Sequence, residues 1–335
     1  MKITAYIAWI AGLALFVGII SYQGVSEVAA TLAVAGWGLL VVTLFHLVPM
    51  WADAVAWSRL IEPTRPRFHR LLWARWVGES VNGLLPAAQI GGDVLKARLL
   101  MHFGVPSVTA GASVVVDLTA AVLTQIIFTG VGLGMLLTIF SEQLAVNAVL
   151  GALLISLLAT WGFFYAQQRG LFTVLVRVLK VVVGDRDWIS SLGDPKALDS
   201  AIVDLYRQDR TILTVCIWRL LGWFLGVGEV WLAMYFLGRP VSLMEALLLE
   251  SLGQAIRAAG FAIPGALGVQ EGGYIFLGSL LGITPDISLA LSLTKRVREL
   301  LLGLPGLLSW QIAEGKRLWL RREKPSKDTS PSADN

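Results

Sequence analysis

Long apolar segments make up most of this chain, and several are long enough to cross a lipid bilayer. A membrane-spanning helix needs about 20 predominantly apolar residues. By this measure the pattern predicts full crossings at residues 3–21, 37–57, 109–139, 144–166, 211–237 and 286–313. We expect the first to be a retained helix, because no clear small-residue cleavage pattern follows it. The predicted fold class is all-α, a polytopic transmembrane helical bundle.

Two further apolar regions, 71–103 and 241–283, are each interrupted near the centre by Gly, Pro and ionisable residues. Such residues occur at membrane depth mainly where broken helices line a cavity or a polar path. We interpret both regions as broken or re-entrant helical hairpins. Each runs on through a Gly and Pro step into another apolar helix, so the two repeat copies extend around 71–139 and 241–313. Three predicted crossings lie between the hairpins, and an odd number indicates an inverted repeat.

Composition and charge support a membrane protein. Of the 335 residues, 56% are hydrophobic and 15% are charged, a smaller charged share than the roughly 25% of soluble domains. The net charge of +4 does not indicate nucleic-acid binding, because no soluble domain carries a basic face. Lys and Arg concentrate in connections that the positive-inside rule assigns to the cytoplasm. We therefore expect a multi-pass protein of the bacterial inner membrane with both termini cytoplasmic.

The chain is expected to form one integral membrane domain, residues 1–322, with a cytoplasmic connection at 167–210. Residues 323–335 are polar and are expected to be a disordered cytoplasmic tail. The sequence contains no zinc-type motif, no nucleophile motif and no phosphate-binding glycine loop. We therefore expect no catalytic residues, no metal and no cofactor, and the protein is not expected to be an enzyme.

A polar cluster surrounds the break of the first hairpin. Asp93 follows a Gly pair where a new helix could begin, and its carboxylate would cap that helix. Lys96 and Arg98 could then bind an anionic phosphate. Alternatively, the cluster is a capped surface helix whose basic residues anchor it at the lipid boundary. The residues of this copy expected to bind substrate are Asn82, Pro86, Gly91, Gly92, Asp93 and Arg98.

The second hairpin repeats these features. Glu250, Gln254 and Arg257 lie four and three residues apart, so they share one helix face. Glu271 follows a Gly-rich break, as Asp93 does in the first copy. Either these side chains contact a substrate, or a Glu–Arg pair only holds the hairpins together. The residues of this copy expected to bind substrate are Arg257, Pro264, Gly265, Gly268, Glu271, Arg296 and Arg298.

Ionisable residues also occur in the helices that follow the hairpins. Asp117 and Arg296 each lie eleven residues after the Pro that precedes their helix. The repeat makes them equivalent, so they could pair across the symmetry axis or face a water-filled vestibule. Arg257, Arg296 and Arg298 are candidates to bind a lipid phosphate.

Three polar residues in the other predicted crossings are weaker candidates. His46 is expected to be a buried side chain with its hydrogen bonds satisfied. Asp53 is expected near the cytoplasmic boundary, paired with Arg59. Glu229 is a lone carboxylate in the 211–237 segment whose partner the sequence does not identify.

The motif residues resemble the signatures of a known family, the membrane region of lysylphosphatidylglycerol synthases, often called the flippase-like domain family. The segment 82–98 resembles its first signature, Asn-x-x-x-Pro-x-x-x-x-Gly-Gly-Asp with a following Arg. The segment 264–271 resembles its second, Pro-Gly-x-x-Gly-x-x-Glu. The length and the Trp-rich character are similar to the bacterial subgroup associated with hopanoid biosynthesis. The chain departs from the family at Asp117, since members often carry a basic residue near that point.

The resemblance implies transbilayer movement of a lipid. The aminoacyl-transferase domain of the bifunctional synthases does not follow, so lipid aminoacylation is not expected. We expect a translocase that moves a polar or glycosylated lipid, such as a hopanoid or its precursor, by alternating access. The expected partners are a membrane lipid and, secondarily, enzymes of lipid biosynthesis.

Three alternatives stay open. The first is a non-catalytic scaffold for lipid-modifying enzymes. The second is an intramembrane enzyme that uses Asp93 or Glu271 as acid or base. The third is an ion exchanger whose acidic groups carry protons.

Overall fold

The computed structural model describes residues 33–84, 91–139, 195–260 and 263–322, together with a few positions between 161 and 169. These segments are helical and contain no strand, as the apolar pattern predicts. The predicted crossing at 3–21, Pro86, most of the crossing at 144–166 and the tail 323–335 lie outside the described residues.

Three helical segments of the described chain are long and apolar enough to cross a membrane: Gly38–Arg59, Ser107–Leu137 and Asp209–Phe236. They match the crossings predicted at 37–57, 109–139 and 211–237. The first consists of α3 (Gly38–Phe45) and α4 (Leu47–Arg59), which meet at His46; the others belong to α7 (Ser107–Ile139) and α12 (Asp209–Phe236).

The predicted crossing at 286–313 lies within α15 (Pro285–Arg322), the longest helix of the described chain. It is not among the three apolar spans. Four ionisable residues interrupt its apolar sequence within five positions: Lys295, Arg296, Arg298 and Glu299. At about 1.5 Å per residue a helix of 38 residues exceeds the roughly 30 Å of a hydrocarbon core.

Both predicted hairpins are broken as expected, and they share one plan. In the first, α5 (Phe68–Leu84) precedes the break and α6 (Gly91–His102) follows it. In the second, α13 (Leu243–Ala259) is followed by the short 3-10 turn η1 (Pro264–Ala266) and by α14 (Val269–Leu280). The first helix has 17 residues and the second has 12 in both copies.

The turn that follows each hairpin is also the same. Gly104 (φ +91°) and Gly282 (φ +68°) adopt the left-handed conformation that favours glycine. Pro106 lies directly before α7, and Pro285 is the first residue of α15. Proline fits the first turn of a helix because the N–H it lacks would have no intrahelical acceptor there.

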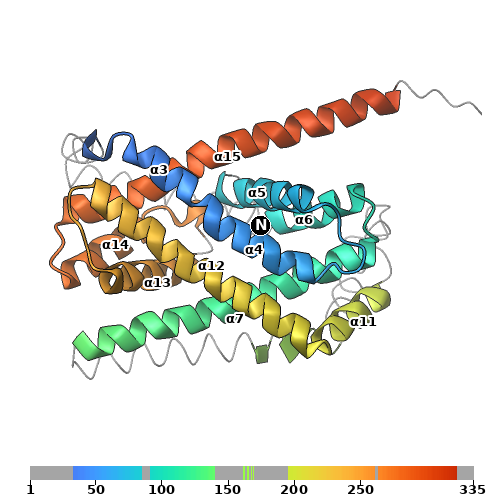
Figure 1. Ribbon diagram of the computed structural model, residues 1–335, viewed down its shortest axis with the longest axis horizontal. Helices are drawn as coiled ribbons and strands as arrows, with labels where there is room; N and C mark the ends of the chain where they lie inside the picture. Colours follow the sequence, from blue (N-terminus) through green and yellow to red (C-terminus); the bar gives the residue numbers. More distant parts are fainter. Residues whose placement is uncertain are drawn as a thin grey trace, which may run out of the picture.

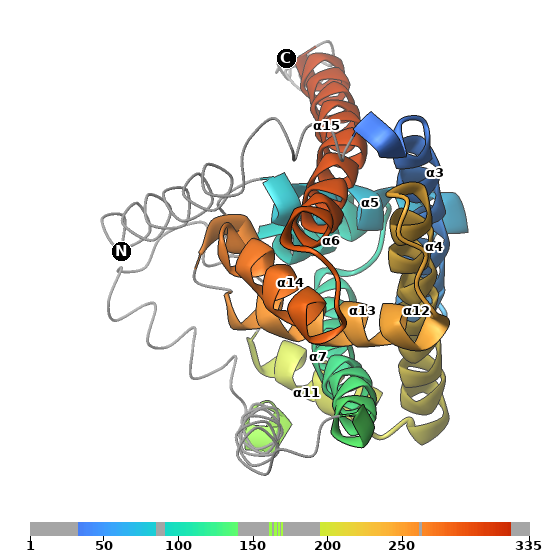
Figure 2. The ribbon, with the colours of Figure 1, turned by 90° about the vertical axis from the view of Figure 1, so that its left-hand side faces the viewer.

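The two copies interlock through their long helices. α5 of the first copy packs against α15 of the second, and α13 of the second packs against α7 of the first. α7 and α15 run in opposite senses along the long axis of the molecule (Figure 1). The short helices of both hairpins lie between α15, α7 and the packed pair of α4 and α12 (Figure 2). The inverted repeat itself stays a prediction, and this reciprocal packing fits it.

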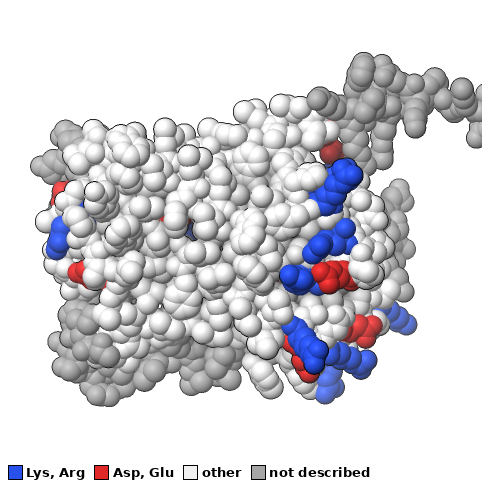
Figure 3. Space-filling view, in the orientation of Figure 1, with Lys and Arg blue, Asp and Glu red and all other residues white. Residues whose placement is uncertain are grey.

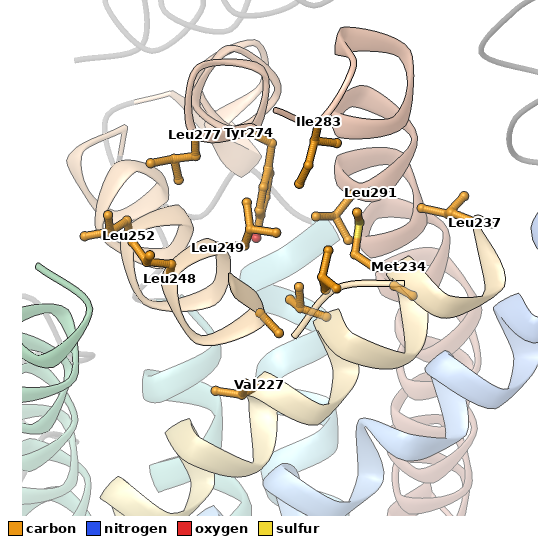
Figure 4. Packing of buried hydrophobic residues seen from close by; sticks show 14 of the residues in the cluster. Val227, Met234, Leu237, Leu248, Leu249, Leu252, Tyr274, Leu277, Ile283 and Leu291 are labelled. Atoms are coloured by element: carbon orange, nitrogen blue, oxygen red, sulfur yellow. The ribbon is translucent and has the colours of Figure 1, made fainter. Parts of the chain in front are cut away.

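Each copy builds its own apolar core. Around the second hairpin, Tyr274 is surrounded by Leu249, Leu277, Ile283 and Leu291 (Figure 4). Around the first hairpin the buried side chains come from α4 to α7, α12 and α11 (Pro195–Tyr206). Since α12 contributes to both clusters, it ties the two copies together.

The surface shows how the molecule meets the bilayer. Lys and Arg gather at the end formed by the α4–α5 turn and α11, and a wide belt that is almost free of charged atoms separates this end from the other (Figure 3). Large apolar side chains are exposed along α3, α7, α12 and α15. A lipid environment satisfies such an exposed apolar surface, whereas water does not.

Two glycines bring α5 and α6 into direct contact. A Cβ at Gly92 would collide with the carbonyl oxygen of Gly78, and it would lie 2.8 Å from the Asn82 side chain. We expect Gly92→Ala to lower the free energy of unfolding by about 1–3 kcal/mol, because α6 must move away from α5. Thermal denaturation of the purified protein in detergent measures the loss.

Gly130→Ala is the matched control, because nothing lies within 4 Å of a Cβ placed at this position of α7. Alanine there should leave stability unchanged or raise it by about 0.5–1 kcal/mol. A Gly92→Ala protein as stable as the Gly130→Ala protein would contradict the close packing of α5 and α6.

Candidate functional site

A polar cavity of about 370 Å³ lies between the two copies. Its wall includes side chains from both hairpins, both long helices, α12 and the α3–α4 segment. The charged and histidine residues of the lining are His46, Asp53, Arg75, Glu79, Asp93, Lys96, Asp117, Arg219, Glu229, Glu250, Arg257, Arg298 and Glu299. Ionisable groups at membrane depth are costly unless they pair or face water, so their concentration here makes this cavity the candidate functional site.

Asp117 is the centre of the first group of ion pairs. Its side chain is fully buried, and one carboxylate oxygen accepts from Lys96 Nζ at 3.2 Å and from Arg75 Nη1 at 3.5 Å. The other oxygen accepts from Arg219, through Nε at 3.1 Å and through Nη2. One carboxylate of α7 therefore binds cations from α5, α6 and α12.

Two further carboxylates complete this group. Asp53 pairs with Arg75 at 2.5 Å and with Arg219 at 3.2 Å, and Asp93 pairs with Lys96 at 2.8 Å. Three carboxylates thus face three cations. We call these six residues the Asp117 cluster: Asp53, Arg75, Asp93, Lys96, Asp117 and Arg219.

Glu229 is the centre of the second group. Arg298 Nη1 donates to its two carboxylate oxygens at 2.5 and 2.6 Å. His46 Nδ1 lies 2.7 Å from one of these oxygens, and Lys295 Nζ lies 3.8 Å from the other. Glu229 was a lone carboxylate in the sequence, and α15 supplies its two cationic partners.

Four more residues surround this centre. Lys295 pairs with Glu250 at 2.6 Å, Arg257 pairs with Glu299, and Glu79 accepts at 2.6 Å from His46 Nε2. We call these eight residues the Glu229 cluster: His46, Glu79, Glu229, Glu250, Arg257, Lys295, Arg298 and Glu299. It contains four carboxylates and three cations, besides the histidine.

Three structural elements contribute to both clusters. Each element supplies one residue to the Asp117 cluster and one to the Glu229 cluster. These are Asp53 and His46 from the α3–α4 segment, Arg75 and Glu79 from α5, and Arg219 and Glu229 from α12. The separations of seven and four residues approximate whole helical turns, whereas ten residues fall about 80° short of three turns, so the residues of each pair lie on the same or adjoining sides of their element. The charges are reversed between the copies: α7 supplies the central acid, whereas α15 supplies cations.

Four of the residues predicted to bind substrate line the cavity: Asn82, Asp93, Arg257 and Arg298. Asn82 and Asp93 are brought together as expected, because the Asn82 amide donates to Asp93 at 3.3 Å. The Asn82 side-chain oxygen also accepts from the backbone N–H of Gly92 at 2.7 Å, which satisfies one of the free donors at the start of α6.

Glu271 and Arg296 do not line the cavity. Glu271 is fully buried, accepts from the backbone N–H of Gly268 at 2.7 Å and so caps α14. Its other oxygen accepts from Arg296 Nε at 3.1 Å, and Arg296 Nη1 donates to the carbonyl oxygen of Gly265 at 2.5 Å. Of the two alternatives for Asp117 and Arg296, the pair is not formed: Asp117 binds Arg75, Lys96 and Arg219 and lines the cavity, and Arg296 binds Glu271.

The predicted glycines and prolines shape the hairpin breaks. Gly265 and Gly268 have positive φ values of 63° and 77°, which glycine adopts without strain. Pro264 is the first residue of η1, and Gly91 is the first residue of α6. These residues position the polar side chains, and those among them that the structure describes are not in the cavity wall.

Two basic residues have partners that the sequence did not indicate. Arg98 is not part of the cavity lining and pairs at 2.6 Å with Glu314 of α15, and its role in phosphate binding stays a prediction. Arg59, expected to pair with Asp53, lies 3.6 Å from Glu62 in the turn after α4. In both cases a cation on the outer surface finds a partner on the outer surface.

Arg75 and Arg219 are the functional candidates that sequence reasoning missed. Arg75 closely follows four other arginines, and the positive-inside rule attributes such a cluster to a cytoplasmic connection and not to a site. Arg219 is a cation inside a predicted crossing, which is itself a signal of function. Within the described chain, no group of His, Cys, Asp and Glu residues has the arrangement to hold a metal ion.

Comparison with protein-family models places residues 9–306 in the lysylphosphatidylglycerol synthase TM region. The match covers most of the chain and confirms the family that the two signatures indicated. No curated protein and no solved structure matches the chain. The hopanoid-associated subgroup stays a prediction.

Changing Asp117 should have a large effect on the stability of the protein. We expect Asp117→Asn to lower the free energy of unfolding by about 3–5 kcal/mol, since it leaves three cations without their shared buried carboxylate. Chemical denaturation in detergent measures it. Adding Arg219→Gln to Asp117→Asn should restore part of the loss, because the two residues are coupled.

Asp204→Asn is the control for this measurement. Asp204 pairs with Arg207 at 3.6 Å on the exposed surface of α11, where an ion pair contributes about 0–1 kcal/mol. If Asp117→Asn were no more destabilising than Asp204→Asn, Asp117 would not be the centre of a buried network.

Proposed function

The chain belongs to the family of the lysylphosphatidylglycerol synthase TM region, and from this premise we propose that it moves a polar lipid across the bacterial inner membrane. Membership of this family indicates a function that is related to membrane lipids. In our proposal the lipid headgroup passes through the cavity between the two copies while its apolar tail stays in the bilayer. The protein acts as a translocase and not as an enzyme.

One observation carries the proposal: a charged cavity inside an otherwise apolar belt. Figure 3 shows a few red and blue atoms within the white band that separates the charged ends. A charged headgroup meets a high barrier in hydrocarbon, because its charge loses water without gaining a partner. The cavity offers such partners, and 370 Å³ falls in the range of small-molecule sites, roughly 300–1,000 Å³.

The ion pairs around the cavity support alternating access. Glu79 of the first hairpin contacts His46, which in turn lies beside Glu229 and Arg298. A displacement of one copy relative to the other would break some of these contacts and form others. Since charged side chains can exchange partners within a polar network, two arrangements of similar energy are feasible here.

Arg257 is the cation best placed to meet a headgroup. Its side chain is 21% exposed, more than any other cation of the two clusters, and it lines the cavity. It is bound by Glu299 and by the side-chain oxygen of Gln270 at 2.9 Å. A lipid phosphate can replace Glu299, because the planar guanidinium binds phosphate and carboxylate in the same way.

The orientation and the cargo belong to the same proposal. The Arg-rich end of Figure 3 faces the cytoplasm by the positive-inside rule. The cargo is a polar or glycosylated lipid, and a hopanoid or its precursor is the first candidate because of the subgroup that the sequence resembles.

A reconstituted flip assay tests the proposal. Purified protein is placed in vesicles that contain fluorescent lipids with different headgroups, and a quencher reports which leaflet they occupy. We expect Arg257→Gln to slow flipping by at least about 10-fold, because a hydrogen bond to a charged group contributes about 1.5–3 kcal/mol.

Arg239→Gln provides the matched control, since the Arg239 side chain is exposed and, within the described residues, donates to the backbone carbonyl of Pro240. Arg98→Gln should also flip at the wild-type rate, because Arg98 lies away from the cavity. Folded protein that flips no lipid would overturn the translocase and favour the scaffold for lipid-modifying enzymes.

A further inference from the structure

His46 lies between two carboxylates, one at each ring nitrogen. Its Nε2 is 2.6 Å from Glu79 Oε1, and its Nδ1 is 2.7 Å from Glu229 Oε2. An ionised carboxylate only accepts hydrogen bonds. Both nitrogens can donate only in the imidazolium form, so this geometry accommodates a ring that carries an additional proton.

The same surroundings also satisfy the neutral ring. Arg298 Nη1 lies 2.9 Å from His46 Nδ1, close enough to donate to it. In this state Nε2–H still donates to Glu79, and Glu229 keeps its contacts with Arg298 at 2.5 and 2.6 Å. Without its proton Nδ1 faces Glu229 Oε2 as a second acceptor at 2.7 Å, so the neutral ring must shift slightly away from Glu229, and Arg298 then becomes the donor to Nδ1. Reversible proton binding here therefore exchanges one partner of Nδ1 for another.

The charges of the Glu229 cluster favour uptake of that proton. Four carboxylates, Glu79, Glu229, Glu250 and Glu299, face three cations, Arg257, Lys295 and Arg298. The neighbouring pair of Arg296 and Glu271 adds one charge of each sign. With a neutral His46 the group has one negative charge in excess, and an imidazolium balances it.

Every helix near His46 supplies part of this environment. α5 presents Glu79, with Arg75 one turn away; α12 presents Glu229; and α15 presents Arg298. Behind these, Lys295 and Glu299 of α15 and Glu250 of α13 complete the network. Asp117 of α7 is bound within the other cluster.

The site faces the cavity, because His46, Glu79 and Glu229 all belong to its lining. The Glu79 side chain is 42% exposed, that of His46 14% and that of Glu229 2%, so the site is most open at Glu79. Since His46 itself lines the cavity, Nδ1 can exchange a proton with cavity water while Nε2 keeps its contact with Glu79.

We propose that His46, Glu79 and Glu229 form a proton-binding site, and that proton movement through it drives lipid translocation. The inference rests on the proposed function, for which it names the driving ion. On loading, an N–H bond forms at Nδ1 with a proton from cavity water, and the Arg298 donor then serves Glu229 alone. On release that bond breaks, its electron pair stays on nitrogen and the proton returns to water.

The test measures proton and lipid movement in the same vesicles. The wild-type protein is reconstituted into vesicles of phosphatidylethanolamine and phosphatidylglycerol that enclose a pH-sensitive dye, and a potassium diffusion potential draws protons inward. We expect wild type to acidify the interior, His46→Gln to behave like protein-free vesicles, and His69→Gln, an exposed control, to behave like wild type. Equal proton influx for His46→Gln and wild type would overturn the proposal.

Flipping of a fluorescent phosphatidylglycerol is followed in parallel, with and without a pH gradient. We expect the gradient to speed flipping in wild type. Flipping that is indifferent to the gradient would overturn the proton inference and leave the proposed function standing. Proton influx without any lipid movement would overturn the proposed function and leave the proton site standing.

A second measurement does not depend on changing His46. In the double variant His69→Gln and His102→Gln, His46 is the one remaining histidine of the chain. Labelled with ¹⁵N-histidine, this protein should show its two ring nitrogens change from one protonated to both protonated as pH falls from roughly 9 to 5. A pattern that stays constant over that range would overturn the proposal.

Discussion

The constraint on which this structure depends is that a charge taken out of water must find its partner inside the protein. Asp117 illustrates it most clearly: a single buried carboxylate is shared by Arg75, Lys96 and Arg219, which come from three different helices. Removing one partner of such a network leaves charges unpaired at a cost of several kcal/mol. The short helices of the first hairpin are too polar to be held in place by lipid alone. Their position follows from these ion pairs, and the cavity is the space that the pairs enclose.

The sequence predicted the elements well because their signals are local. Apolar length predicted the three spans seen in the described chain, Gly and Pro predicted the two breaks, and the spacing from Gly268 to Glu271 is that of a helix cap. Some side-chain directions were also accessible. Lys96 lies three residues after Asp93, about 60° around the helix, whereas Arg98 lies five residues after it, about 140° around. This difference explains why Lys96 faces Asp117 and Arg98 faces the outer surface.

Partners on other helices could not be read from the sequence in the same way. Asp53 has Arg59 nearby in the chain, yet it binds Arg75 and Arg219, because the choice depends on how α4 is rotated against α5 and α12. The expected pairing of Asp117 with Arg296 assumed that equivalent positions meet at the symmetry axis. Instead each of these residues is neutralised by other partners: Asp117 by Arg75, Lys96 and Arg219, and Arg296 by Glu271. Repetition in the backbone therefore does not imply repetition in the chemistry.

Helix α5 connects the Asp117 cluster with the Glu229 cluster, and the connection depends on the spacing of its residues as well as on their charges. Arg75 serves one ionic centre and Glu79 the other, one helical turn apart on the same rigid rod. Because both contacts are made by one helix, α5 cannot rotate to improve the contact of Arg75 with Asp117 without straining the contact of Glu79 with His46. Adding a single residue between them would turn Glu79 by about 100° and detach it from His46. The spacing of four residues therefore makes the two ionic centres depend on one another, because any rotation of α5 that changes the contacts of Arg75 also changes those of Glu79.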